Sequence, residues 1–183
     1  MVGEERVCTI VDCSRCGRCC REPIVPVTYR DVLRISRFLK QPPQRFVRFF
    51  SPSEMNYDPD APLWIRFRYG KRAMGLKRVS EKCVFLSGDF TCSVYKNRPV
   101  TCRSFPHSIE LNSKNRKIES VTLNKITQCK AKPSHTTVEN DLIKIAKQEI
   151  REDSHYYSII EKWNSSRKTG GVKHFLAFLG FET

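Results

Sequence analysis

Eight of the nine cysteines in this chain fall into two sets, and the first set is unusually dense. Cys13, Cys16, Cys19 and Cys20 lie within a single eight-residue run. The second set is spread over the middle of the chain and consists of Cys83, Cys92, Cys102 and Cys129. Thiolates are soft ligands that favour zinc, copper(I) and iron–sulfur centres. The distribution therefore predicts a chain built around a metal, with Cys8, outside both sets, as a small half-buried apolar residue.

The rest of the chain favours metal binding over disulfides as the use of these thiols. The N-terminal segment has mixed charges and lacks the apolar stretch of a secretory signal, so we expect a cytoplasmic protein. No apolar run approaches the length of a membrane span, so we expect no membrane partner. In a reducing compartment a high cysteine count indicates metal. Disulfides stay an alternative if the source is a hyperthermophile.

The net charge of +14 is unevenly distributed. Residues 1–135 carry 26 Lys or Arg against 12 Asp or Glu, whereas residues 136–183 carry seven of each kind. We predict a cysteine-cluster metal-binding domain over 1–135 and a helical extension over 136–183 that packs on it. The short apolar tail at 175–181 either packs back on the domain or docks on a protein partner. The basic surface suits RNA, DNA or an acidic partner.

Apolar periodicity predicts helices at both ends of the chain. The first runs to residue 39, with Thr28 as its N-cap and Asp31 completing a capping box. A second short helix over residues 44–50 would form a helical hairpin with it. The segment 51–62 is predicted to be a loop, and one long helix is predicted over residues 138–163.

Alternation predicts short strands in between. One strand covers residues 63–69 and returns after a turn at Gly70–Lys71. We expect Trp64, Arg66 and Arg68 on one face of it and Ile65, Phe67 and Tyr69 on the other. Two more hairpins are expected, one with Cys83 and Cys92 on its two arms and one turning within residues 112–116. The predicted class is α+β: a small metal-stapled domain with an N-terminal cysteine loop, a helical hairpin, short antiparallel hairpins and a C-terminal helix.

The spacing within the first cysteine run narrows the choice of metal centre. A Cys-x2-Cys unit turns two thiolates back onto one metal, and Cys13, Cys16 and Cys19 match the first three positions of the bacterial ferredoxin spacing. The fourth position departs, because Pro23 occupies it and the extra thiol is Cys20. We expect the adjacent Cys19 and Cys20 to point in different directions. They would then suit a larger cluster, two separate centres, or one centre beside a free thiol.

The joint pattern of both sets is similar to a known family. CSRCGRCC, then CVFLSGDFTCSVYKNRPVTCRSFP, then Cys129, resembles the CxxCxxCC family of zinc- or iron-chelating domains, the YkgJ-like cysteine-cluster proteins. The resemblance implies eight metal ligands, Cys13, Cys16, Cys19, Cys20, Cys83, Cys92, Cys102 and Cys129. A related domain occurs in flagellin lysine methylases, where an iron–sulfur cluster is implicated. The resemblance thus leaves open a redox or methylation-linked enzyme component.

Sulfur ligation fits both cofactors that the family name offers. We favour an iron–sulfur cluster, of the 4Fe–4S kind, over zinc, because Cys19 and Cys20 are crowded and no histidine has ligand spacing. Arg98 and Arg103 would then offset thiolate charge near Cys102 and donate hydrogen bonds to cluster sulfurs. The alternative for Arg98 is a carboxylate partner or a turn cap. His107 is interpreted as lying on the surface or beside the ligands.

Residues 61–80 contain six basic side chains and no acidic one. These are Arg66, Arg68, Lys71, Arg72, Lys77 and Arg78. Arginines bind phosphates and stack on bases, so this hairpin is a candidate for binding RNA or a ribonucleoprotein. Six neutralised phosphates would give a log–log salt slope of about −4 to −5. The alternative is a solvated basic strand.

The sequence contains no phosphate-binding loop, dinucleotide motif or hydrolase constellation, so no catalytic residue is assigned. The leading hypothesis is a metal-binding protein whose centre is chiefly structural and whose basic face binds RNA or a ribonucleoprotein. The alternatives are an iron–sulfur redox or methylation-linked enzyme component and a metal-stapled protein-interaction module.

Overall fold

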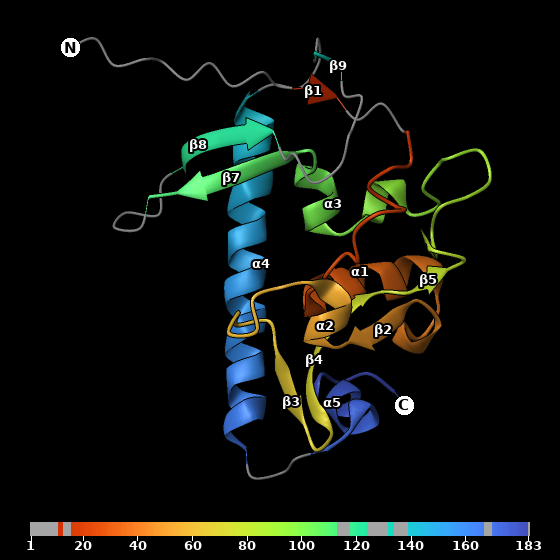
Figure 1. The fold of residues 1–183 in the computed structure, drawn as a ribbon, viewed down its shortest axis with the longest axis vertical. Coiled ribbons are helices and arrows are strands. Elements are labelled where there is room, and N and C mark those ends of the chain that lie inside the picture. The colour runs from red at the N-terminus through yellow and green to blue at the C-terminus, as the bar shows by residue number, and fades with distance from the viewer. Residues whose placement is uncertain are drawn as a thin grey trace.

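The fold is α+β, as predicted, with small antiparallel sheets and a long C-terminal helix (Figure 1). It is seen in a computed structural model that describes residues 11–12, 16–112, 118–123, 132–133, 139–166 and 170–182. In this part of the chain no helix combines the length and the apolar character needed to cross a membrane.

The first predicted helix is confirmed, but its predicted partner is not a helix. In α1 (Tyr29–Leu39) the Thr28 side chain accepts from the Asp31 N–H, and the Asp31 side chain accepts from the Thr28 N–H. Residues 43–45 form a single 3-10 turn, η1 (Pro43–Arg45), and the chain then enters strand β2 (Val47–Phe50). The predicted helical hairpin is therefore wrong, because aromatic and β-branched residues favour a paired strand here.

A three-stranded antiparallel sheet carries the middle of the fold, in the order β2–β4–β3, with β3 at Ile65–Phe67 and β4 at Gly70–Leu76. The predicted hairpin forms, but Phe67 pairs with Gly70, so its turn is formed by residues 68–69. Residues 65–68 alternate between buried and exposed as predicted, whereas Trp64 is buried unlike Arg66 and Arg68, and Tyr69 is exposed unlike Ile65 and Phe67. The predicted loop before this hairpin contains the short helix α2 (Pro52–Met55).

Short elements follow the sheet and carry most of the second cysteine set. They are β5 (Arg78–Val79), β6 (Lys82–Cys83), the 3-10 turn η2 (Tyr95–Asn97) and helix α3 (Val100–Ser104). The predicted last hairpin is present as β7 (His107–Leu111) and β8 (Ile118–Leu123), and β1 (Val11–Asp12) pairs with β9 (Lys132–Pro133). Most of the predicted turn at 112–116 lies outside the described residues.

The long predicted helix is present as α4 (Glu139–Ser165), with the short α5 (Val172–Phe178) after it. In Figure 1 the β7–β8 hairpin lies near the N-terminal half of α4, and β3, β4 and α5 lie near its C-terminal half. One hydrophobic cluster contains Ile35 of α1, Ile65 of β3, Ile160 of α4 and Phe175 of α5. Elements from both predicted domains thus share a core, and the division at residue 135 stays a prediction.

Candidate metal centre

Four separate stretches of chain bring five cysteine side chains to the wall of one cavity of about 60 Å³. The five are Cys19, Cys20, Cys83, Cys92 and Cys102. The remaining wall is largely apolar, with Val25, Leu76, Phe85 and Val94 among its residues. Cysteines up to 83 positions apart in the sequence therefore meet at one largely apolar, half-buried site.

The N-terminal cysteine loop reaches this cavity through a tight turn and one backbone hydrogen bond. Gly17 has a φ of +69°, which a residue with a side chain rarely adopts, and the Cys20 N–H donates to its carbonyl at 3.2 Å. The Cys83 N–H then donates to the Cys20 carbonyl at 2.7 Å. This bond joins the two cysteine sets directly through the main chain.

Cys83 and Cys92 come from neighbouring turns, and their predicted hairpin is paired differently from expectation. Cys83 pairs with Arg78 in the β5–β6 ladder, whereas Cys92 forms an isolated bridge with Leu86. The loop between Leu86 and Cys92 is closed by Ser87, whose N–H donates to the Thr91 carbonyl at 2.9 Å. The two thiols are therefore placed by two small turns and not by one ladder.

Cys102 lies on α3, and the start of that helix is held by a residue far away in sequence. The Val100 N–H donates to Asp31 Oδ1 at 3.0 Å, so the carboxylate that caps α1 also caps α3. Arg34 forms a hydrogen-bonded ion pair with the same carboxylate. Sequence reasoning assigned Asp31 only to the local capping box, because a partner 69 positions away leaves no local signal.

The prediction that Cys19 and Cys20 diverge is wrong. Their Sγ atoms lie 3.9 Å apart, because the turn after Gly17 brings both side chains to the cavity. Two thiolates on one tetrahedral zinc would be separated by about 3.8 Å, given a zinc–sulfur bond of about 2.3 Å. The pair is thus spaced like two ligands of one metal atom.

The cavity disfavours thiolate charge that no cation balances. Burial raises the pKa of Cys83 to about 11, and the nearby charges of Cys92 and Cys19 add to this effect. Burial, followed by the charges of Cys83 and Cys19, also raises the pKa of Cys102 well above its usual value. For Cys19 the hydrogen bond with Cys20 is the largest cause of a raised pKa, ahead of burial. Several thiolates here need a cation, which fits a metal ligand set.

The described cysteines line a cavity, but their side chains do not converge on the position of a single metal ion. Among the residues that the structure describes, no three His, Cys, Asp or Glu side chains are arranged to hold one metal ion. Cys16, on the same loop, is close enough for its charge to raise the pKa of Cys19. Of the other predicted ligands, Cys13 and Cys129 lie outside the described residues, as does Cys8.

The two arginines predicted near Cys102 have different surroundings. Arg98 lines the cavity, where its charge lowers the pKa of Cys19 and Cys102, and its guanidinium lies 4.2 Å from the centre of the Tyr95 ring. Burial lowers the pKa of Arg103, and the charges around it are those of Arg34, Glu152, Asp31 and Arg98. Hydrogen bonding from either arginine to cluster sulfurs stays a prediction.

His107 is buried, so of its two predicted positions the surface one is wrong and the one beside the ligands stays a prediction. Its Nδ1 lies 3.2 Å from the carbonyl oxygen of Ser104, at the end of α3. The residue therefore belongs to the support of the helix that carries Cys102.

Arg78 has a structural position that the sequence did not indicate. Its guanidinium donates to three carbonyl groups, those of Pro23 at 2.9 Å, Arg21 and Glu81. These carbonyls follow the first cysteine run and precede Cys83, so Arg78 fastens one cysteine segment to the other. Its charge also lowers the pKa of Cys83, against the larger effect of burial.

The other basic residues of the predicted nucleic-acid hairpin are in unequal positions. Arg66 and Arg68 are exposed. Lys71 donates to the Pro59 carbonyl at 2.8 Å, and Lys77 donates to the Gln44 carbonyl at 2.6 Å. Arg72 donates to the Lys71 carbonyl at 2.8 Å. Nucleic-acid binding by this hairpin stays a prediction, and the exposed part of it is centred on Arg66 and Arg68.

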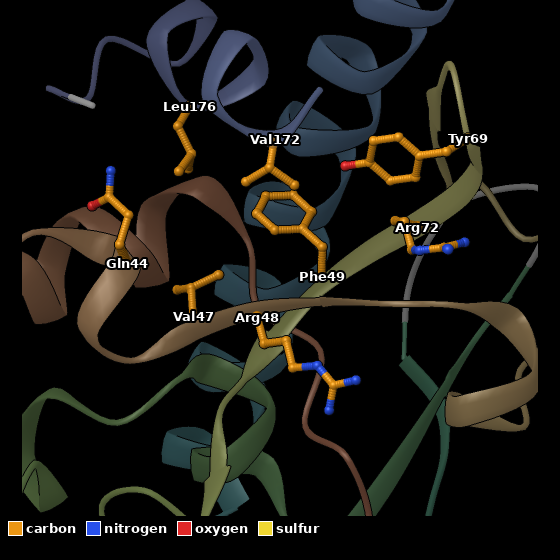
Figure 2. Close-up of a pocket in the computed structure, with 8 residues that line it drawn as sticks. All are labelled: Gln44, Val47, Arg48, Phe49, Tyr69, Arg72, Val172 and Leu176. Atoms are coloured by element: carbon orange, nitrogen blue, oxygen red, sulfur yellow. The ribbon is translucent and has the colours of Figure 1, made fainter. Parts of the chain in front are cut away.

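A different cavity, of about 330 Å³, lies between β2 and α5 (Figure 2). Figure 2 shows Val47, Phe49, Val172 and Leu176 gathered at its centre, with Arg48 on the other side of the strand. Its lining contains no cysteine or carboxylate, so it offers no metal ligand.

The donor chemistry of the cysteine-lined cavity defines a metal-chelating domain. The model of the CxxCxxCC family, described as a "putative zinc- or iron-chelating domain", matches residues 12–130. The chain therefore belongs to this family, and the resemblance inferred from the sequence is confirmed.

A curated relative extends the comparison to another organism. The uncharacterized protein MJ0661 of Methanocaldococcus jannaschii is 33% identical to this chain over 106 residues, which is 55% of this chain and 47% of that protein. The match thus spans about half the length of the relative. No solved structure was found to match the chain.

Proposed function

We propose that the cysteine-lined cavity binds an iron–sulfur cluster. The observation that carries the proposal is that five thiols face one cavity while no three described ligand side chains are arranged for a single ion. A structural zinc ion takes four ligands that converge in a tetrahedron, and the described side chains do not converge in that way. A polynuclear centre accepts ligands that are spread around a larger volume.

The Cys19–Cys20 pair refines the proposed cluster. In a 4Fe–4S cluster with four cysteine ligands each iron takes one thiolate, whereas an iron of a 2Fe–2S cluster takes two. The 3.9 Å separation of the two sulfurs matches two ligands of one tetrahedral metal atom. Either one iron takes both sulfurs, or one of the pair is not a ligand and the 4Fe–4S prediction holds.

The proposed role of the centre is chiefly structural. Its ligands lie on segments that are far apart in sequence, and a metal that binds such segments contributes its binding free energy to folding. The described site contains no group assigned to acid–base or nucleophilic chemistry. A redox or methylation-linked role is the alternative, and zinc is the alternative cofactor.

The test is anaerobic purification with metal analysis, acid-labile sulfide analysis and Mössbauer spectroscopy. We expect iron and sulfide in equal amounts, with two or four irons per chain. Cys19→Ser and Cys20→Ser, made separately, should both lose the cluster if one iron takes both sulfurs, whereas only one of them should lose it otherwise. One equivalent of zinc without sulfide would overturn the proposal in favour of a mononuclear site.

A further inference from the structure

A third cavity, of about 140 Å³, lies on the other side of α3 from the thiols. Thr101 lines this cavity, whereas the next residue, Cys102, lines the thiol cavity. The 140 Å³ cavity differs chemically from the thiol cavity, because two carboxylates and three tyrosines contribute to its wall. They are Glu149, Asp153, Tyr57, Tyr156 and Tyr157.

The geometry of α4 explains why four of these residues meet. Glu149, Asp153, Tyr156 and Tyr157 are separated by four, three and one positions, so they lie along one stripe of the helix. Tyr57 joins them from the segment after α2. It is 44% exposed and therefore lies where the cavity meets solvent.

The carboxylates of this cavity form no ion pair among the described residues. No described Lys, Arg or His lies within 4.0 Å of Glu149 or Asp153, whereas Arg34 on the neighbouring helix pairs with Asp31 and Glu152. Burial is the main cause of a raised pKa at Glu149, which the hydroxyls of Ser104 and Thr101 and the more distant charge of Arg103 moderate. Burial raises the pKa of Asp153 to about 7. The cavity is thus acidic within a strongly basic protein.

The tyrosines point to a missing ligand independently of the carboxylates. Tyr156 is 97% buried, and its hydroxyl has no hydrogen-bond partner among the described atoms. A buried hydroxyl without a partner costs about 1–3 kcal/mol, so a ligand that accepts from it would remove a penalty. Burial is the main cause of a raised pKa at Tyr57 and Tyr157, and the nearby charges of Asp153 and Glu149 add to it.

We propose that this cavity binds a small organic ammonium ion, a primary amine with a short alkyl chain and a hydrogen-bond acceptor within reach of Tyr156. Carboxylates neutralise such a cation, and tyrosine faces attract it. Apolar side chains such as Leu63 and Met74, which also line the cavity, suit the alkyl part. The volume holds several heavy atoms on the scale of ~30 Å³ for a water molecule.

A hard metal ion fits the same cavity less well. Calcium and magnesium need several oxygen ligands converging at about 2.0–2.6 Å. No three described Asp, Glu, His or Cys side chains converge in this way. The ammonium proposal does not rest on the iron–sulfur proposal, since none of the groups that it uses is a thiol.

The experiment is calorimetric titration of the full chain, purified with its metal, at constant ionic strength. The probes are 4-hydroxybutylammonium, its neutral counterpart 1,4-butanediol, and calcium chloride. We expect one ammonium ion to bind per chain and the diol to bind at least tenfold more weakly. Equal binding of the diol and the ammonium ion, or competition by calcium at similar concentration, would overturn the proposal.

Matched variants locate the binding. Glu149→Gln and Asp153→Asn should each weaken ammonium binding about tenfold, and the double variant should abolish it. Glu161→Gln removes an exposed charge from the same helix and should change nothing. Tyr156→Phe should weaken the hydroxylated amine severalfold but leave butylammonium unchanged, with a melting temperature equal to or above that of the wild type. Unchanged metal content shows that each variant is folded, and full ammonium binding by the folded double variant would contradict the site.

Discussion

The two cavities on either side of α3 differ in how their residues are recruited. The thiol cavity collects five cysteines from separate segments of chain. The cavity lined by Glu149 and Asp153, called here the ammonium cavity after its proposed ligand, takes both carboxylates and two of its three tyrosines from α4 alone. The first is visible in the sequence because cysteine is rare and its spacing is diagnostic. The second uses common residue types, and its character depends on which face of the helix is buried.

Because their residues come from several segments in one case and mainly from one helix in the other, the two cavities should respond differently to mutation. The thiol cavity depends on contacts between distant segments, so damage to those contacts should reach both metal binding and stability. The ammonium cavity depends on one regular helix, so single changes should affect its charge and leave the fold intact.

The largest expected effect tests whether the thiol cavity depends on each of its cysteines. Cys102→Ser keeps the size of the side chain but removes a soft ligand from the cavity. We expect bound metal to fall by about tenfold or more, since even outer hydrogen-bond partners of ligands are worth 10–100-fold. Metal analysis after anaerobic purification gives the readout. Cys8→Ser, outside both cysteine sets, is the control, and equal metal loss in both variants would contradict the assignment.

The next largest effect tests whether Arg78 stabilises the thiol cavity without affecting the cavity lined by Glu149 and Asp153. Arg78→Met removes the three carbonyl contacts that join the cysteine segments. We expect a loss of about 3 kcal/mol in the free energy of unfolding, measured by urea titration, and weaker metal retention. Arg68→Met, at an exposed position, should cost less than about 0.5 kcal/mol. Unaltered ammonium binding by folded Arg78→Met would show that the two cavities are supported separately. A loss of stability no larger than that of Arg68→Met would contradict the role given to Arg78.

A smaller effect concerns the pH dependence of stability. The pKa of Asp153 is raised to about 7 by burial and by the charges of Glu149, Asp31 and Glu152. An acid whose pKa is higher in the folded state binds more protons there, so stability falls as pH rises from about 4 to about 7. Asp153→Asn should remove this part of the slope in urea unfolding curves collected across that range. Parallel curves for the variant and the wild type would show that Asp153 is not a source of the pH dependence.

The smallest effect concerns the basic hairpin, which lies outside both cavities. If RNA binds through Arg66 and Arg68 alone, the log–log salt slope should be about −1.5 to −2, well below the value expected for six phosphates. Fluorescence anisotropy with a structured RNA over a range of salt concentrations measures this slope. Arg66→Glu with Arg68→Glu should abolish binding. A slope near −5, or binding that survives the double change, would show that other cations form the interface.

Local patterns predicted what local interactions decide. The N-cap of α1 at Thr28 and the extent of α4 were predictable, because a capping box and an apolar stripe form within one segment. Strand β2 was not, because its aromatic residues have a period that suits either a helix or a strand over so short a window. Pairing with β4 makes this segment a strand, and the sequence of β2 alone does not indicate that partner.

The candidate sites show the same limit. The cysteines were predictable from residue type, but the second role of Asp31 and the contacts of Arg78 depend on segments that meet only in three dimensions. The ammonium cavity left one signal, because Glu149 falls within the apolar stripe of its helix. Burying a carboxylate costs free energy unless the carboxylate is paired. An acidic residue within an apolar helical stripe therefore indicates a candidate binding site.

The hydrogen bond from the Cys83 N–H to the Cys20 carbonyl, together with the three carbonyls held by Arg78, is made by the polypeptide alone. Two of the segments that supply sulfurs are thus joined by contacts that use no thiol. A change of the cation at the sulfurs would leave this connection between the segments in place.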